Sequence, residues 1–315
     1  MNSVQNTTKP LVSIGIPVYN GEKFIRKRLE NILSQTYSNF ELIISDNAST
    51  DMTSKIYHEF ISKYNHIKYF KQENNVGGIK NYQFVLSKAK TKYFVFAPVD
   101  DMWNKTFLEK NVSILEKDDS IVGSIGKIEW YGKNVNDKFS LHNDDTLFQK
   151  YYKRIRKKFQ HHGADSIKET TFEKRAAIFL RKLQTQNPSF ILYSVFRTNA
   201  LQKSIQPKKF LDEFYHSFWN NVCVSILEYG GIHLIDEILI YYNTDGGGYG
   251  VTPITQFKKN QISLVQCIIP WSGQISWFVH KFGLKFFLKY FIDFLGLFIM
   301  GEVIFFLSIF KELKK

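Results

Sequence analysis

Cysteine is scarce in this sequence of 315 residues, and the two that occur form no site pattern. Cys223 and Cys267 are too few for a disulfide framework, and no Cys-x-x-Cys pair offers ligands to zinc. The opening ten residues, MNSVQNTTKP, lack the apolar core of a signal peptide. The sequence therefore predicts a cytoplasmic chain in a reducing compartment.

Two common nucleotide-binding motifs are missing after the first apolar run, residues 12–18. No Gly-x-Gly-x-x-Gly follows it, which disfavours a dinucleotide-dependent oxidoreductase, and no Gly-Lys-Ser/Thr follows it, which disfavours a P-loop enzyme. A sugar nucleotidyltransferase would carry a glycine- and arginine-rich loop here, whereas the sequence reads PVYNGEKF.

Long uncharged apolar runs are missing as well. Residues 286–310 are almost entirely apolar, but Lys289, Asp293 and Glu302 interrupt them before the ~18 uncharged residues that a spanning helix needs. We expect a helix that lies in the membrane interface, with the lysines of 311–315 against anionic head groups. The alternative is an apolar helix that packs on the rest of the protein or in a homodimer.

Acidic residues are the scarcer charge, since 29 Asp and Glu oppose 42 Lys and Arg, for a net charge of +13. This excess favours a polyanionic partner: a phosphorylated metabolite, a nucleic acid or an anionic membrane surface. Aromatic residues are plentiful, with 29 Phe and 17 Tyr, so the chain has the apolar surface that a folded core requires.

The N-terminal part has the pattern of an α/β fold. Short apolar runs alternate with segments of helical period, and the runs are continuous, as in strands of a parallel sheet buried on both faces. The predicted strands are residues 12–18, 40–45, 67–71, 93–99 and 121–130.

Polar and charged residues follow these strands, at the edge of the sheet where open α/β folds bind ligands. Asp100 and Asp101 follow the fourth run, and two adjacent carboxylates there are costly unless a cation is present. Oxygen ligands suit Mg²⁺ or Mn²⁺, which take their remaining ligands from water and substrate phosphates. We predict a divalent cation bound together with a diphosphate.

Three further segments fit a nucleotide ligand. Tyr19, in the turn after the first strand, is placed to lie against a nucleobase, and Asp46, after the second, to accept the imide N–H of a uracil or thymine. The segment 75–81 opens a helix with glycines, so that backbone N–H groups and Lys80 approach phosphate or ribose. Taken singly, each is as typical of an ordinary turn.

Four motifs in this order carry a family resemblance: PVYN (17–20), DNASTD (46–51), NVGGIKN (75–81) and VDD (99–101). The chain resembles the family 2 inverting glycosyltransferases, which have the GT-A fold. The resemblance is firm over about residues 10–130 and continues weakly to about residue 245. It implies a Rossmann-like, mostly parallel sheet flanked by helices, to which the apolar stretch 286–310 adds a C-terminal helical, membrane-associating extension.

The resemblance also implies roles for single residues. Asp101 is the direct metal ligand, and Asp100 contacts the metal or the ribose. The remaining contacts to the nucleotide sugar are assigned to Pro17, Tyr19, Asn20, Asp46, Gly77, Lys80 and Asn81.

The general base is the irregular point. The family places an acidic residue before an aromatic one at the start of a helix that ends in a glycine turn, here DEFYHSFWNNVCVSILEYGG. Counting back from the glycines, no carboxylate stands at that position; His216 is nearest, and Asp212 and Glu213 lie one turn earlier. An imidazole suits base work at neutral pH, so His216 is favoured, with the two carboxylates as alternatives.

The resemblance implies three parts: a nucleotide-sugar-binding half over 1–132, an acceptor-binding half over 133–250, and an apolar, basic extension over 251–315. The implied function is inverting transfer of a hexose or deoxyhexose from a UDP- or dTDP-type sugar to a glycan or lipid-linked oligosaccharide, in surface polysaccharide or lipopolysaccharide synthesis at the inner face of the cell membrane.

Two alternatives stay open: a catalytically impaired relative that still binds nucleotide sugars, and a basic nucleic-acid-binding α/β protein. The run YYKRIRKKF (151–159) suits nucleic acid. Such a protein leaves the paired carboxylates unexplained, so no nucleic acid is expected.

Overall fold

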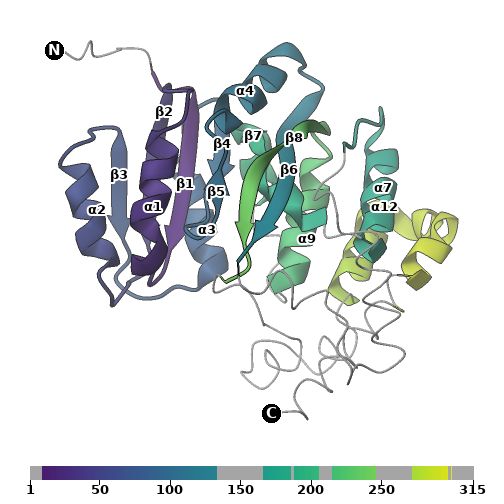
Figure 1. Cartoon of the computed structure of the whole chain (residues 1–315). Coiled ribbons are helices and arrows are strands. Elements are labelled where there is room, and N and C mark those ends of the chain that lie inside the picture. Colours follow the sequence, from purple (N-terminus) through teal and green to yellow (C-terminus); the bar gives the residue numbers. More distant parts are fainter. Residues whose placement is uncertain are drawn as a thin grey trace, which may run out of the picture. The chain divides into compact units, whose positions relative to one another are not determined.

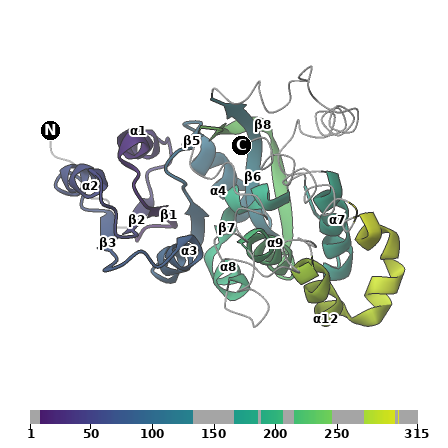
Figure 2. The same ribbon diagram turned by 90° about the horizontal axis from the view of Figure 1, so that it is seen from below.

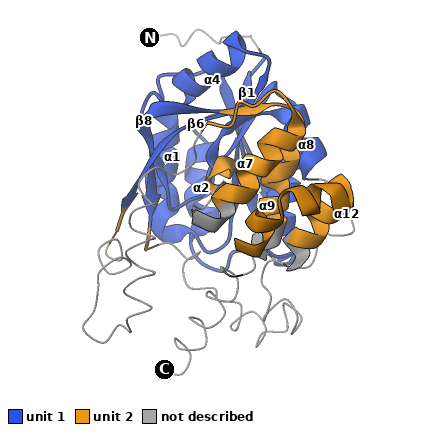
Figure 3. Cartoon of the chain, turned by 90° about the vertical axis from the view of Figure 1, so that its right-hand side faces the viewer, with its two compact units in different colours: residues 1–130, 193–205, 233–243 blue, residues 131–192, 206–232, 244–315 orange. Residues whose placement is uncertain are grey.

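The computed structural model describes residues 9–132, 166–185, 188–205, 215–245, 272–296 and 299. The chain divides into two compact units, coloured separately in Figure 3. The first unit comprises residues 1–130, 193–205 and 233–243, and the second comprises 131–192, 206–232 and 244–315.

One half of the first unit's sheet is parallel. Its strands lie in the order β3-β2-β1-β4, and they are β1 (Val12–Val18), β2 (Phe40–Asp46), β3 (Ile67–Lys71) and β4 (Tyr93–Phe96). Helices α1 (Glu22–Leu33) and α2 (Thr53–Ile61) cover one face, and α3 (Gly78–Ser87) covers the other (Figures 1 and 2). The predicted α/β arrangement is confirmed.

Two residues of β1 show why the sequence forms this sheet. Gly15 allows α3 to pack closely, because a Cβ atom there would lie 2.4 Å from Val85 and 2.5 Å from Phe94. Pro17 has no N–H to donate, and it lies beyond Gly15↔Phe96, the last pair between β1 and β4. No ladder hydrogen bond to β4 is therefore lost.

The predicted fourth strand, 93–99, is too long, since β4 ends at Phe96. The Ala97 N–H still donates to the Gly15 carbonyl at 2.8 Å, but Pro98 has no N–H with which to extend the ladder. The chain turns at Val99 and Asp100, and Asp101 stands directly before β5 (Met102–Trp103). The two carboxylates thus lie in a turn between two strands.

Beyond β4 the sheet continues through antiparallel pairs. The order is β7 (Val195–Arg197), β6 (Ile121–Tyr131), β8 (Gly231–Asn243) and β5. Helices α4 (Phe107–Lys117) and α8 (Thr198–Ser204) also belong to the first unit. Strands β4 and β6 both pair with β7, and β5 pairs with β8. Because β5 pairs with the end of β8, Asp101 is brought to Asn243.

The second unit contains the helices α7 (Phe172–Thr185), α9 (Tyr215–Ile226) and α12 (Ser272–Lys289), and the 3₁₀ helix η1 (Pro188–Tyr193) leads out of it. Helix α9 packs on α12 and buries Phe218, Val222 and Cys223. Gly283 kinks α12, with a φ of 78° that favours glycine.

The predicted apolar helix over 286–310 is described only as far as residue 296 and at residue 299, where it is helical apart from a turn at Tyr290. None of the helices in the described ranges is long and apolar enough to cross a membrane. The basic run 151–159 lies outside the described residues.

Candidate functional site

The turn after β1 leaves a tyrosine ring open to solvent. Tyr19 is 50% exposed. Asn20 follows with a φ of 49°, a left-handed conformation that asparagine tolerates. Its N–H donates to the Ser49 hydroxyl at 2.9 Å, and its Oδ1 accepts the Thr50 N–H at 2.9 Å. Asn20 therefore ties the β1 and β2 loops together, and the Tyr19 ring is open to a ligand.

Asp46 ends β2 and is completely buried. Its Oδ1 accepts the Ser49 N–H at 2.8 Å and its Oδ2 accepts the Tyr69 hydroxyl at 2.7 Å. Burial raises the pKa of Tyr69 to about 12, and the hydrogen bond to Asp46 adds to the rise, so the tyrosine stays a donor. Asp46 shapes the loop in this structure, and a nucleobase would reach it by using a second lone pair or by displacing a partner.

The start of α3 carries an exposed lysine, Lys80, and a buried asparagine, Asn81. Gly77 has a φ of 86°, and its N–H donates to the Asn75 side chain at 2.9 Å. Lys80 is exposed on the first turn of the helix. Asn81 is buried, accepting the Ser45 hydroxyl at 2.6 Å and donating to the Ser45 carbonyl at 3.1 Å. Lys80 is thus placed to meet a ligand, while Asn81 holds α3 on β2.

The acidic pair is the most unusual feature of the first unit. Asp101 is 1% exposed, and its Oδ1 accepts the Asn243 N–H at 2.8 Å. Its Oδ2 is buried and has no hydrogen-bond partner in the described part of the chain. Burial, and then the negative charge of Asp100, raise the pKa of Asp101 to about 7. Burial also raises the pKa of Asp100, and Arg28 opposes both shifts.

The pair fits a divalent cation. A buried carboxylate oxygen without a donor, next to a second carboxylate, is stabilised by a positive ion. Within the described ranges, no group of three or more His, Cys, Asp or Glu side chains is placed to hold a metal. Asp100 and Asp101 would therefore supply two oxygen ligands and leave the others to water and a phosphorylated ligand, as Mg²⁺ and Mn²⁺ allow.

The base candidates belong to the second unit. His216 is the second residue of α9, and its side chain lies outside the described part. Asp212 and Glu213 lie outside the described residues altogether. All three stay predictions.

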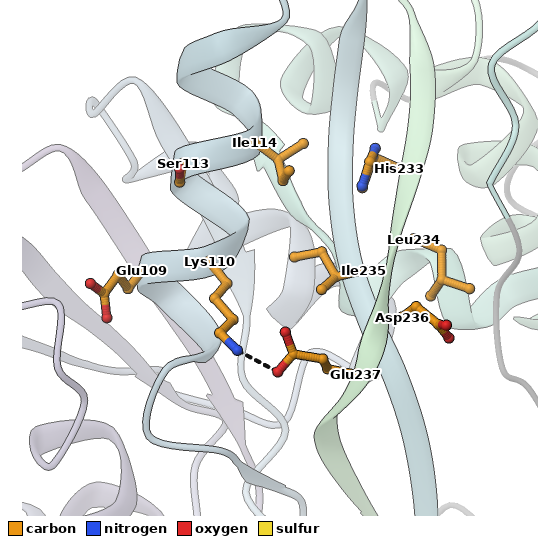
Figure 4. Close-up of a pocket in the computed structure, with 9 residues that line it drawn as sticks. All are labelled: Glu109, Lys110, Ser113, Ile114, His233, Leu234, Ile235, Asp236 and Glu237. Carbon is orange, nitrogen blue, oxygen red and sulfur yellow. Dashed lines mark hydrogen bonds and ion pairs between the residues drawn. The ribbon is translucent and has the colours of Figure 1, made fainter.

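A surface groove lies elsewhere in the first unit, between α4 and the first half of β8 (Figure 4). Two of its acidic side chains are paired within the protein, since Lys110 contacts Glu237 and Lys127 contacts Asp236. The groove residues of β8, 233–237, precede Asn243 by at least ~20 Å along the strand. This groove is separate from the acidic pair.

Sequence reasoning missed three residues around the acidic pair: Arg28, Asn243, and Tyr193, whose hydroxyl lowers the pKa of Asp101 through a hydrogen bond. Arg28 had a signal, because it shares the buried helix face of Ile25 and Leu29, where a charge is unusual. Asn243 contributes through its backbone, which no side-chain pattern reveals.

The comparisons with known proteins agree on one family. The family model "Glycosyl transferase family 2" matches residues 13–183, more than half of the chain. An uncharacterized glycosyltransferase of Rickettsia typhi is 38% identical over 117 residues, which cover 37% of this chain and 35% of the relative. TuaG of Bacillus subtilis, a glycosyltransferase assigned provisionally to teichuronic acid biosynthesis, is 32% identical over 109 residues, 34% of this chain and 42% of TuaG. The chain thus spans about two fifths of these relatives or less.

A solved structure extends the likeness beyond the matched segment. S. aureus TarS 1–349 in complex with UDP-GlcNAc aligns with a TM-score of 0.53 over 80% of this chain and 64% of that chain. The sequence identity is 19%, so the likeness concerns the fold.

Proposed function

The chain belongs to glycosyl transferase family 2, and we propose that it transfers a sugar from a nucleotide-diphosphate sugar to a hydroxyl group of a glycan acceptor, with inversion at the anomeric carbon. Its fold is GT-A, as the resemblance implied. The observation that carries the proposal is the adjacent pair Asp100–Asp101 in the turn after β4: Asp100 is half-buried, Asp101 is buried, and one oxygen of Asp101 has no hydrogen-bond partner among the described residues.

The acidic pair has the chemistry of a diphosphate-binding site. Asp100 and Asp101 would hold Mg²⁺ or Mn²⁺. When bound, this cation would offset the negative charge that develops on the departing diphosphate. Lys80, exposed at the start of α3, adds a cation for the same group.

The donor is proposed to be of the UDP or dTDP type. Tyr19 is the exposed aromatic ring of the β1 turn, and base–aromatic stacking is tolerant of base identity. Asp46 is the acceptor that would favour a pyrimidine imide, and Pro17, Asn20, Gly77 and Asn81 shape the loops around it. UDP-GlcNAc, which TarS binds, is the first donor to try.

The reaction exchanges one bond for another at the anomeric carbon. The acceptor oxygen forms a bond to this carbon, the bond to the diphosphate oxygen breaks, and the nucleoside diphosphate leaves with the electron pair. The acceptor proton passes to a base on the opposite side of the sugar ring. We assign this base to His216, with Asp212 and Glu213 as the alternatives.

Release of nucleoside diphosphate from UDP-, dTDP- and GDP-sugars, with Mn²⁺ and a glycan acceptor mixture, tests the proposal. We expect turnover with a UDP- or dTDP-sugar that Asp101→Asn reduces at least ~100-fold, because it removes a metal ligand. His216→Gln should abolish acceptor-dependent release while UDP binding persists. Donor binding without release by the wild type would instead identify a catalytically impaired relative.

The acceptor is proposed to be carried on a membrane lipid, because the end of the second unit exposes an apolar helix face. Six large side chains in the helical segments after Gly283 are 45% to 83% exposed: Leu284, Leu288, Phe291, Ile292, Leu295 and Ile299. The opposite side is already buried through Phe286 and Phe294. A face of this kind is typical of a membrane-surface helix.

Lysines border this apolar face and would meet anionic head groups. Lys285 and Lys289 are exposed on its flank, and Lys289 also pairs with Glu173. We therefore assign residues 251–315 to contact with the inner face of the cell membrane. We assign residues 1–132 to donor binding and residues 133–250 to acceptor binding, in an enzyme of surface polysaccharide synthesis. The provisional assignment of TuaG to teichuronic acid biosynthesis supports a role in polysaccharide synthesis.

Co-sedimentation with phosphatidylcholine vesicles, with and without phosphatidylglycerol, tests the contact. Ile292→Asp should reduce binding at least ~10-fold, because a buried isoleucine stabilises by ~2 kcal/mol. Ile238→Asp changes an isoleucine that is likewise exposed, on β8, and should bind as the wild type does. If Ile292→Asp instead splits a dimer and the wild type ignores vesicles, the face is a homodimer interface.

A further inference from the structure

Three half-buried aromatic side chains of the first unit lie close together. They are Trp130 near the end of β6, Tyr193 at the end of η1, and Tyr242 near the end of β8. The ring centres of Trp130 and Tyr242 are 5.3 Å apart, and those of Tyr193 and Tyr242 are 6.0 Å apart. Rings at these distances are in contact, so the three side chains form one aromatic cluster.

The aromatic cluster lies at the edge of the sheet that carries the acidic pair. Strand β7 is antiparallel to both β4 and β6, so β4 and β6 run in the same direction. Trp130, at the carboxyl end of β6, is therefore at the same edge as Asp100 and Asp101, which follow the carboxyl end of β4. Tyr193 precedes β7, and the amino end of this antiparallel strand lies at that edge too.

Tyr242 lies next to Asp101. The antiparallel register of β5 and β8, continued by one residue, places Asp101 opposite Tyr242. The N–H of the following residue, Asn243, donates to Asp101 Oδ1 at 2.8 Å. The Tyr193 hydroxyl forms a hydrogen bond with Asp101 as well. The aromatic cluster thus begins at the proposed metal ligand and extends from it to Trp130.

The proposed nucleotide contacts and the aromatic cluster lie on different strands. Tyr19 follows β1, Asp46 ends β2 and Lys80 lies on α3, all in the parallel half of the sheet. The cluster belongs to β6, β8 and the segment before β7, and β4 stands between the two sets of strands in the order of the sheet. A diphosphate at the acidic pair, with its nucleoside over β1 and β2, would therefore direct its sugar toward β6 and β8. The acceptor must meet the sugar there.

The chemistry of the aromatic cluster suits a sugar ring. One face of a hexopyranose carries axial C–H groups and is apolar, and these weakly positive hydrogens pack on the negative face of an aromatic ring. Tyrosine also offers a hydroxyl group to the polar rim of the sugar. The three side chains are uncharged, so they suit a neutral sugar ring better than a phosphate.

We propose that Trp130, Tyr193 and Tyr242 form the subsite for the acceptor sugar, whose ring packs on the aromatic cluster while its reacting hydroxyl faces the anomeric carbon of the donor. The reaction itself rests on the proposed function, and the new element is the set of residues that recognises the acceptor. Tyr193 and Tyr242 fall within 133–250, the part assigned to acceptor binding, and Trp130 lies three residues before it.

Saturation-transfer NMR with the methyl β-glycosides of glucose, galactose and N-acetylglucosamine, in the presence of UDP and Mn²⁺, tests this subsite. A glycoside that packs on the aromatic cluster receives saturation from the protein. Trp130→Ala should reduce that transfer at least ~5-fold, because a ring contact is lost, and Trp130→Phe should retain most of it. No transfer to any of the three glycosides, or equal transfer in Trp130→Ala, would contradict the proposal.

Two further variants control for folding and for a general effect of aromatic residues. Trp130→Leu keeps apolar bulk without a ring, and it should lose the transfer as Trp130→Ala does, including the case in which the alanine variant does not fold. Tyr64→Ala removes an exposed tyrosine near the end of α2 and should give the transfer of the wild type. Full transfer in Trp130→Leu, or an equal loss in Tyr64→Ala, would count against the subsite.

Calorimetry with UDP and UDP-GlcNAc separates an acceptor subsite from a donor subsite. Trp130→Ala should leave the Kd of both within ~2-fold of the wild type. Weaker binding of UDP-GlcNAc alone would place the donor sugar on the aromatic cluster and overturn the proposal. If the wild type binds no UDP, the proposed donor site is wrong, whereas saturation transfer to a glycoside without UDP, and its loss in Trp130→Ala, still reports the acceptor subsite.

Discussion

Asp101→Asn should make the metal-free protein more stable while removing its response to metal. The carboxylate is buried beside Asp100, and one of its oxygens has no hydrogen-bond partner in the described part of the chain. Asparagine keeps an oxygen to accept the Asn243 N–H and carries no charge. The substitution therefore removes an unfavourable interaction of the folded state, which is typical of residues that serve a ligand and not the fold.

The size of the expected stability gain follows from the pKa shift of the Asp101 carboxyl group. In the fold the pKa of Asp101 is raised from 3.8 to about 7, first by burial and then by Asp100. Ionising it at pH 8 therefore costs up to ~4 kcal/mol of unfolding free energy. Because the two carboxylates share part of this cost, we expect Asp101→Asn to gain about half of it, ~2 kcal/mol. That gain corresponds to a rise of about 4–8 °C in melting temperature.

The pH dependence gives the direction of the stability difference between Asp101→Asn and the wild type. Well below pH 3.8 the carboxyl group is protonated in both the folded and unfolded chains, and its burial as an acid carries no charge penalty. As the pH rises from 4 to 7, the folded chain holds the extra proton, so its stability falls relative to the variant, and above pH 7 the difference is constant. At pH 5 the gain should be about a third of its value at pH 8.

Thermal unfolding in EDTA at pH 8 and pH 5, repeated at pH 8 with Mn²⁺, measures these effects. Mn²⁺ should raise the melting temperature of the wild type and leave Asp101→Asn unchanged. Asp119→Asn changes an exposed aspartate and should stay within ~0.5 kcal/mol of the wild type. A variant that is less stable than the wild type at pH 8, or equally stabilised at both pH values, would refute the reasoning.

Three further predictions concern the donor loops. Tyr19→Ala should raise the Kd for UDP about 10-fold in calorimetry, by losing a stacking contact worth ~1–3 kcal/mol, while Tyr64→Ala, at a distant exposed tyrosine, leaves it unchanged. Gly77→Ala should lower the free energy of unfolding in denaturant by ~1 kcal/mol, because the φ of 86° at Gly77 disfavours a side chain. No atom lies within 4 Å of the added Cβ, so a loss above ~3 kcal/mol would contradict this prediction. Lys80→Ala should weaken UDP binding about 5-fold and reduce its salt dependence, and the matched exposed change Lys90→Ala should do neither.

The parallel half of the sheet was predictable because each strand carries its own signal. Strands buried on both faces read as unbroken apolar runs, and the bounds predicted for β1 and β3 agree with the structure at every residue. The end of β4 was misjudged because the apolar run continues past Pro98, and the lack of an N–H there outweighs hydrophobicity. A pattern of apolar residues does not show which backbone N–H groups are available for strand pairing.

The surroundings of the acidic pair were less predictable because they depend on distant pairing. Strand β5 has two residues and exists through its pairing with β8, more than 130 residues later. The buried bond between Asp46 and Tyr69 likewise joins two strands and has no local signal. Arg28 differs, since its place on the apolar face of α1 was visible in the helical period.

Calorimetric titration with UDP, dTDP and GDP, each with and without Mn²⁺, tests the central claim most directly, because it asks whether Asp100 and Asp101 form a metal-dependent nucleotide site. We predict binding of UDP or dTDP that needs Mn²⁺ and is lost in Asp101→Asn. Binding that is independent of the metal, or no binding of any of the three nucleotides, would contradict the proposed donor site.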